Sequence, residues 1–135
     1  MVRKATTDDI DAIAGLVSAN TDRLLARDRH EIAQLLDTFW VAQADGRVVG
    51  CGCLEIYSPK IAELRSLAIA PEYRGRGLGA ALTRAIVAEA ERRGIPQVLV
   101  VTSNREFFER LNFGPCLNEK YALFWINPDI ADTTP

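Results

Sequence analysis

The sequence lacks the features that mark membrane, secreted and nucleic-acid-binding proteins. No apolar run approaches the roughly 20 residues of a spanning helix, and the charged and polar segment 3–9 lies where a signal peptide needs its apolar stretch. The 16 Lys and Arg residues are outnumbered by 18 Asp and Glu residues, for a net charge of −2, and no basic stripe is present. We therefore expect a cytoplasmic protein that binds a small molecule, with no membrane and no nucleic-acid partner.

Cysteine and histidine are also scarce, which argues against a metal site. Cys51 and Cys53 lie two residues apart in a strand-like run, so they face the same way but are poorly placed to bond each other, and Cys116 leaves an odd count. His30 is the only histidine that could add to this Cys-x-Cys pattern. We expect buried free thiols, no metal, and a surface position for His30.

The length of the chain allows one domain. A chain of 135 residues with 48% hydrophobic content can form one ordinary core, but not separate cofactor and substrate domains. We expect a single domain over residues 1–127. Residues 128–135, with two prolines and little apolar content, are expected to form a loose tail.

Helical and strand patterns alternate along the chain. Period-two runs predict strands, and apolar residues at helical spacing predict helices. The expected strands cover residues 2–5, 38–44, 47–57, 61–69, 97–101 and 120–126, and the expected helices cover residues 7–20, a segment from residue 28, residues 78–93 and a short segment opened by Ser103. Three local signals support these bounds: Thr7 as an N-cap, the Asp28-x-x-Glu31 capping box and the Asp45-Gly46 hairpin turn.

The most informative feature is a glycine-rich turn between the strand that ends at Ile69 and the helix that follows. Alternating glycines allow backbone N–H groups to form one concavity, and the dipole of the next helix adds partial positive charge. Arg74 and Arg76 add full charges and forked donors. We expect a pyrophosphate to bind here rather than a plain strand-to-helix turn. The predicted residues are Arg74, Gly75, Arg76, Gly77, Leu78, Gly79 and Ala80.

A dinucleotide fingerprint is the alternative interpretation of the same turn. Gly75, Gly77 and Ala80 satisfy G-x-G-x-x-A. However, residues 71–73 separate the turn from its strand, and no acidic residue lies near positions 100–101, where the ribose-binding acid is expected. The pattern therefore disfavours a nicotinamide or flavin cofactor.

Two ordered motifs resemble the signatures of the GCN5-related N-acetyltransferases, the GNAT family. The segment Ala62–Ile69, Pro71 and the glycine turn resemble the R/Q-x-x-G-x-G/A motif, and the run Asn104–Phe113 is similar to the later F-Y-x-x-x-G-F motif. The resemblance covers most of the chain, from Val2 to about Phe113. It implies an α/β (α+β) fold with a central, mixed, mostly antiparallel sheet, a splayed strand pair and about four flanking helices.

The resemblance also implies acetyl-CoA as cosubstrate and acetyl transfer to an amine. The main chain of Leu67, Ala68 and Ile69 would bind the pantetheine arm, with Asn104 and Phe108 as further cofactor contacts. The backbone N–H of Leu67 or Ala68 would stabilise the oxyanion. Core packing is the structural alternative for the side chains of Leu67 and Ile69, and both roles are compatible.

Glu63 is the candidate base, since it resembles the catalytic glutamate of several family members. Strand alternation predicts Glu63, Arg65 and Leu67 on one face. A surface glutamate paired with Arg65 is the alternative. Phe108 stands where many members have a tyrosine acid and cannot donate a proton, so packing beside the pantetheine is its expected role.

Two residues that are usual in the second family motif are missing from this sequence: the tyrosine acid and a glycine. Water, Tyr57, Tyr73 or Tyr121 could supply a proton to the thiolate, which is a fair leaving group without one. Asn112 replaces the usual glycine, and it tolerates the left-handed backbone of a helix end.

Several segments are similar to the acetyltransferase domain of N-acetylglutamate synthases. They are residues 24–27, 31–32, 40–42, 50–52 and 62–64, together with the aromatic pair at 107–108. The resemblance implies the α-amine of an acidic amino acid such as glutamate as acceptor. Arg27, with Arg29 or Arg65, would bind a carboxylate through a two-pronged bond. A solvated loop and helix start is the alternative for Arg27 and Arg29.

Other outcomes stay open because residues 114–121 lack the basic stretch of those synthases. An arsinothricin-type amino-acid acetyltransferase is one alternative. An acetyl-CoA-binding regulatory module without efficient catalysis is another. A homodimer would also resemble the family.

Overall fold

The computed structural model describes residues 1–20, 27–115 and 123–129. The chain forms two compact units, Met1–Val100 and Val101–Pro135. The expectation of one domain over residues 1–127 stays a prediction. Cys116, Tyr121, residues 24–26 of the similarity to the synthases and most of the predicted tail lie outside the described residues.

The first unit is built on one five-stranded sheet with the strand order β1-β2-β3-β4-β5. Neighbouring strands pair antiparallel from β1 to β4, and β5 pairs parallel with β4. This confirms the predicted mixed, mostly antiparallel sheet. The strands are β1 (Val2–Lys4), β2 (Phe39–Ala44), β3 (Arg47–Ser58), β4 (Ile61–Ile69) and β5 (Gln97–Leu99).

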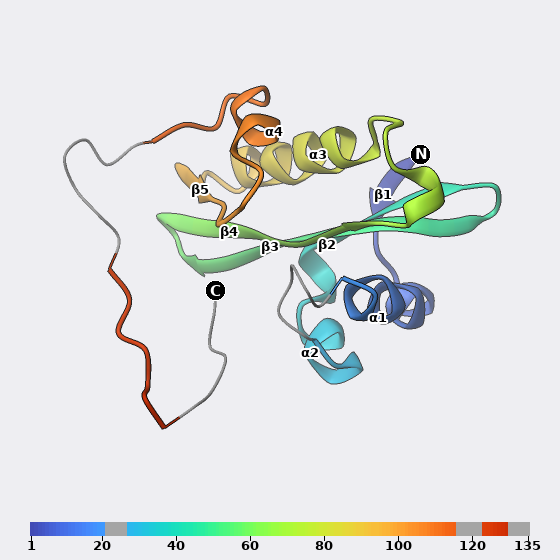
Figure 1. The fold of residues 1–135 in the computed structure, drawn as a ribbon, viewed down its shortest axis with the longest axis horizontal. Helices are drawn as coiled ribbons and strands as arrows, with labels where there is room; N and C mark the ends of the chain where they lie inside the picture. Colours follow the sequence, from blue (N-terminus) through green and yellow to red (C-terminus); the bar gives the residue numbers. More distant parts are fainter. Residues whose placement is uncertain (21–26, 116–122, 130–135) are drawn as a thin grey trace. The chain divides into compact units, whose positions relative to one another are not determined.

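Helices cover both faces of this sheet. The longest, α3 (Leu78–Arg92), packs on β3 and β4 from one side, and α1 (Ile10–Ser18) packs on the same strands from the other, next to α2 (Arg29–Gln34) (Figure 1). Short 3-10 turns cover Thr7–Asp9, Leu36–Thr38 and Pro71–Tyr73. None of the helices in the described ranges has the length and apolar content needed to cross a membrane.

The local signals in the sequence mark these elements closely. Asp28 accepts a hydrogen bond from the Glu31 N–H at 2.9 Å, which confirms the predicted capping box of α2. Asp45 and Gly46 have φ angles of 51° and 74°, as expected for a tight hairpin between β2 and β3. The predicted cap at Thr7 is wrong by one residue: Thr7 already belongs to a 3-10 turn, and the cap is Thr6, whose backbone is extended and whose N–H donates to the Asp9 carboxylate at 2.8 Å.

The two cysteines of β3 belong to the core between the sheet and α1. Cys51 and Cys53 are free and completely buried, with Ile13, Val17 and Ile32 around them. Burial raises the pKa of Cys51 to about 12 and that of Cys53 to about 11. Both thiols are therefore neutral at physiological pH, as expected of buried free thiols.

Gly52 gives α3 its close approach to the other face of the sheet. A Cβ at Gly52 would lie 2.8 Å from Ile86 Cδ1 and 3.3 Å from Leu67 Cδ1. The missing side chain therefore lets Ile86, on α3, reach the surface of β3. The same contact places the Leu67 side chain on the α3 face.

A β-bulge in β4 overturns the predicted alternation of Glu63, Arg65 and Leu67. Cys53 pairs with Arg65 but Cys51 pairs with Ala68, so β4 contains one extra residue at this point. Ser66 has a φ angle of 57°, in the left-handed region that a non-glycine residue rarely adopts. Glu63 and Arg65 consequently share the α1 face with Cys53, whereas Leu67 lies on the α3 face.

Strands β4 and β5 separate soon after they meet. Their parallel pairing joins Ile61 to Gln97, Ala62 to Val98 and Glu63 to Leu99, and then stops. Over the ranges that the structure covers, no strand pairs with residues 64–69 on that edge. This is the predicted splayed strand pair, although β5 ends at Leu99 and not at residue 101.

The second unit contains α4 (Arg105–Glu109). Asn104 caps this helix by accepting a hydrogen bond from the Phe107 N–H at 3.3 Å, so the cap is not Ser103. The ring of Phe108 packs edge-on against Phe107 and Phe113, with centroid distances of 4.8 and 5.4 Å.

Two predictions about the end of the second unit have different outcomes. Asn112 has a φ angle of 69°, which confirms that it can replace the glycine of the family motif. The last strand, expected over residues 120–126, is absent over the described part, residues 123–126.

Candidate active site

Six polar side chains gather on the α1 face of the sheet, beside the bulge. Glu55 and Tyr57 come from β3, Glu63, Arg65 and Ser66 from β4, and Arg27 from the segment that precedes α2. Glu55 lies directly opposite Glu63 in the antiparallel register, so their side chains share one face. We call Arg27, Glu55, Tyr57, Glu63, Arg65 and Ser66 the polar cluster.

Glu55 joins the two arginines of the polar cluster. Its Oε2 accepts a hydrogen bond from Arg27 Nη2 at 3.0 Å and another from Arg65 Nη1 at 3.1 Å. The side chain of Arg27 is 7% exposed and that of Arg65 is 24% exposed, so both contacts are partly shielded from water. The two guanidinium groups therefore converge on the position of one carboxylate oxygen.

Arg27 also contacts the bulge itself. Its Nε donates to Ser66 Oγ at 2.8 Å, and Ser66 is a buried residue. This bond holds the side chain of a residue whose backbone is in an unfavourable conformation. Arg27 thus links the segment before α2 to the point where β4 changes its alternation.

Tyr57 is bonded to the candidate base. Its hydroxyl donates to Glu63 Oε1 at 2.6 Å, and Arg65 Nε lies 4.0 Å from the same oxygen. Burial and the hydrogen bond to Glu63 raise the pKa of Tyr57 to about 12, so its hydroxyl stays protonated at neutral pH. Tyr57 can therefore orient the Glu63 carboxylate. Of the two proposed tyrosine acids among the described residues, Tyr57 and Tyr73, Tyr57 is the one beside a candidate catalytic group.

The structure brings together Arg27, Glu63 and Arg65 but separates Arg29 from them. Arg29 Nε lies 2.7 Å from Asp11 Oδ1 in an exposed ion pair. Of the two neighbours proposed for Arg27, Arg65 is the one that shares its carboxylate.

Glu55 and Ser66 were not predicted as site residues. The period of two along β3, which puts Glu55 on the face of Cys53, is the signal that could have identified Glu55. No local signal marks Ser66, because serine is not a residue that favours a left-handed backbone.

The glycine turn has the backbone conformation that its sequence predicts. Gly75 and Gly77 have φ angles of 77° and 81°, and Gly77 is the N-cap of α3. A Cβ at either glycine would meet no atom of the described residues within 4 Å, so in the described part nothing packs against this side of the turn. Backbone N–H groups at such a helix start can bind an anion.

Arg74 has structural partners as well as its predicted charge. Its Nε donates to the Ile69 carbonyl at 3.3 Å and its Nη2 to Asn20 Oδ1 at 3.1 Å. These bonds connect the turn to the end of β4 and to the residue that follows α1 by two positions. Binding of a phosphate by Arg74 stays a prediction.

Tyr73 connects the turn to the β2–β3 hairpin. Its buried ring has the Arg76 guanidinium 4.7 Å and the Arg47 guanidinium 5.3 Å from its centroid, and its hydroxyl donates to the Asp45 carboxylate. Tyr73 is thus part of the support of the glycine turn and is not in the polar cluster.

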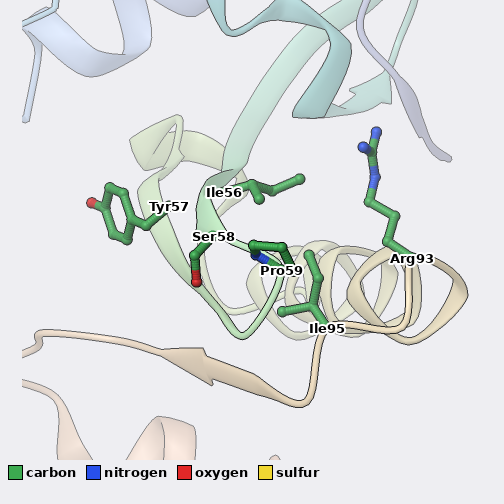
Figure 2. Close-up of a pocket in the computed structure, with 6 residues that line it drawn as sticks. All are labelled: Ile56, Tyr57, Ser58, Pro59, Arg93 and Ile95. Atoms are coloured by element: carbon green, nitrogen blue, oxygen red, sulfur yellow. The ribbon is translucent and has the colours of Figure 1, made fainter.

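A shallow cavity of about 350 Å³ lies at the opposite end of α3 from the glycine turn. It is lined by Ile56, Tyr57, Ser58, Pro59, Arg93 and Ile95 (Figure 2). The ring of Tyr57 points away from Arg93 and Ile95 (Figure 2), toward the polar cluster on the other face. The cavity contains none of the residues predicted to bind cofactor or substrate. Within the described ranges, no group of three His, Cys, Asp or Glu side chains is arranged to hold a metal ion.

Most of the chain matches one protein family. Residues 8–113 match the model of the "Acetyltransferase (GNAT) family". The chain belongs to this family, and the prediction of an N-acetyltransferase is confirmed.

Relatives with named activities support the same class. An uncharacterized N-acetyltransferase of Chlorobaculum tepidum is 34% identical over 114 residues, covering 83% of this chain and 74% of that protein. An amino-acid acetyltransferase of Mycobacterium tuberculosis is 33% identical over 117 residues, covering 84% of this chain and 67% of that protein.

Solved structures show the same fold. A Mycobacterium tuberculosis protein in complex with CoA superposes with a TM-score of 0.80 at 33% identity, covering 83% of this chain and 70% of the other. N-acetylglutamate synthase from Neisseria gonorrhoeae, complexed with coenzyme A and N-acetyl-glutamate, has a TM-score of 0.76 at 26% identity. That match covers 82% of this chain and 27% of the synthase chain.

Proposed function

We propose that this protein transfers the acetyl group of acetyl-CoA to the α-amine of an acidic amino acid such as glutamate. The observation that carries the proposal is the convergence of Arg27 and Arg65 on one carboxylate, beside Glu63 and the bulge of β4. The N-acetyl-glutamate in the related synthase and the name of the Mycobacterium tuberculosis amino-acid acetyltransferase support this substrate class.

The arginine pair supplies a binding site for a substrate carboxylate. Arg27 and Arg65 already direct two donors at one carboxylate oxygen, so a ligand carboxylate in the same place would accept charge-assisted hydrogen bonds from both arginines. A substrate bound there would lie next to Glu63 of the same polar cluster, so its amine can be oriented toward that base.

Two parts of the chain fit acetyl-CoA. The open turn from Arg74 to Ala80, at the start of α3, would hold the pyrophosphate, with Arg76 adding positive charge. The edge of β4 that β5 leaves, at Leu67, Ala68 and Ile69, would bind the pantetheine arm through its main chain. Asn104 and Phe108 stay predicted contacts of the cofactor.

The chemistry follows from these positions. The amine nitrogen forms a bond to the acetyl carbon, the carbon–sulfur bond breaks, and the amine proton passes to Glu63, directly or through one water. The N–H of Leu67 or Ala68 stabilises the negative charge that develops on the carbonyl oxygen. Tyr57 holds Glu63 in place, and the thiolate leaves without a proton from Phe108.

The test is thiol release from acetyl-CoA between about pH 7 and pH 9, measured with each common amino acid for the wild type and for Glu63→Gln. We expect turnover selective for acidic amino acids, and a loss of about 10²-fold or more in Glu63→Gln, since general base catalysis contributes about 10²–10⁴-fold. Undiminished turnover in Glu63→Gln would remove Glu63 from this role.

Calorimetry with acetyl-CoA and the thiol-release assay together separate the two alternative functions. Tight binding of acetyl-CoA without amine-dependent thiol release would favour the regulatory module. Selective turnover of arsinothricin would favour an arsinothricin-type amino-acid acetyltransferase. A cytoplasmic location and a homodimer are further parts of the proposal, which fractionation and size-exclusion chromatography test.

A further inference from the structure

The arginine pair that we assign to the substrate already has a carboxylate. Glu55 Oε2 accepts from both Arg27 Nη2 and Arg65 Nη1, at 3.0 and 3.1 Å, and no other carboxylate of the polar cluster contacts both guanidinium groups. Glu55 therefore takes the position in which a ligand carboxylate would receive the same two donors.

The charges of the polar cluster are balanced without a ligand. Arg27 and Arg65 face Glu55 and Glu63, two cations against two anions. An added substrate carboxylate would leave this shielded group with one excess negative charge, which is unfavourable where water is limited. Binding of a carboxylate is thus coupled to the loss of at least one Glu55 contact.

Glu55 also has room to withdraw, unlike its partner Arg27. The Glu55 side chain is 21% exposed whereas that of Arg27 is 7% exposed. Tyr57 does little to hold Glu55 in place, because its hydroxyl lies 3.4 Å from Glu55 Oε2 but only 2.6 Å from Glu63 Oε1. Arg27 has a second bond, to Ser66 Oγ, that does not involve Glu55 and that can hold its guanidinium in position for the substrate.

We propose that Glu55 is a specificity-determining residue that competes with the substrate carboxylate for Arg27 and Arg65. This inference rests on the proposed function of the same site. Glu55 sets how strongly an acidic substrate binds relative to a neutral one of equal size. When Glu55 occupies the two arginines for most of the time, only a small fraction of the molecules can bind the substrate carboxylate. The apparent Kd is then the intrinsic Kd divided by that fraction.

The test compares Glu55→Gln with the wild type, using glutamate and its neutral isostere glutamine as acceptors. Glutamine at position 55 keeps the size and an acceptor oxygen but removes the charge. We expect the KM for glutamate to fall about tenfold, and the preference for glutamate over glutamine to rise by a similar factor. Glu91→Gln removes the same charge from an exposed site on α3 and is the matched control.

Glutarate provides a measurement that does not depend on catalysis, since it has two carboxylates and no amine. We expect calorimetry to show about tenfold tighter glutarate binding to Glu55→Gln than to the wild type. If no amino acid is acetylated, the proposed function fails while the glutarate comparison still tests Glu55. Unchanged or weaker glutarate binding by a variant that melts like the wild type would overturn the inference.

Glu55→Asp covers the case in which Glu55→Gln does not fold. The aspartate keeps the charge and withdraws the carboxylate by one methylene, so glutarate binding should tighten by about threefold. Binding equal to that of the wild type would again overturn the inference.

Discussion

Replacing Arg27 and Arg29 in turn by glutamine separates an arginine of the polar cluster from an arginine of the surface. The two residues are separated by one residue in the sequence, and both were candidates for binding the substrate carboxylate. Arg27 is 7% exposed and bonded to Glu55 and Ser66, whereas Arg29 is 71% exposed and paired only with the exposed Asp11 among the described residues. The structure therefore predicts very different costs for the same chemical change.

The cost of Arg27→Gln follows from the two bonds that it removes. Both bonds are donated by the charged guanidinium, and such a hydrogen bond contributes about 1.5–3 kcal/mol, but the loss is reduced because Arg65 still donates to Glu55, which is partly exposed to water. We expect the free energy of unfolding to fall by about 2–3 kcal/mol, and the melting temperature by roughly 8–12 °C for a domain of this size. Arg29→Gln should melt like the wild type, because exposed ion pairs contribute little.

Thermal unfolding and amino-acid turnover check this prediction together. Arg27→Gln should raise the KM for the amino acid as well as lower the melting temperature, whereas Arg29→Gln should change neither. Equal melting temperatures for the two variants would refute the packing argument. A KM raised only in Arg29→Gln would show that the substrate carboxylate binds to Arg29 and not to Arg27.

Two further changes test the support of the site and of the fold. Tyr73→Phe removes the hydroxyl bond to Asp45 and loosens the ring beside Arg76, so calorimetry should show acetyl-CoA binding weakened by about threefold to tenfold; unchanged affinity would exclude this support. The hydrogen bond from Arg3 lowers the pKa of Asp9, so this carboxylate stabilises the fold at neutral pH, and the contribution is lost as the pH falls through the lowered pKa. Urea unfolding should therefore show a lower free energy of unfolding for Asp9→Asn than for the wild type at pH 7, and a smaller difference between them in acid. An equal difference at pH 7 and in acid would contradict the link between the Asp9 pKa and stability.

The sequence alone was sufficient where structure depends on neighbouring residues. The capping box at Asp28, the hairpin turn at Asp45 and the left-handed glycines at positions 75 and 77 all follow from short-range bonds and allowed φ angles. Because these signals are local, they marked the strands, the helices and the turn that we assign to the pyrophosphate.

Neighbouring candidates of similar chemistry were less easily resolved. Thr6 and Thr7 both have a side chain that can cap a helix, as do Ser103 and Asn104. Thr7 and Ser103 were predicted as the caps, but the structure has Thr6 and Asn104 in these positions. The choice depends on the exact residue at which the backbone turns helical, which packing of the helix decides.

The tertiary structure decided what the polar residues do. Alternation along β4 predicts Glu63, Arg65 and Leu67 on one face, but pairing with β3 places an extra residue at Ser66 and turns Leu67 to the other side. The sequence by itself determined the family, the order of the elements and the glycine turn, since these depend on local patterns. Only the fold brought Arg27 to Glu55, because the contact depends on strand register and on a bulge that no single segment encodes.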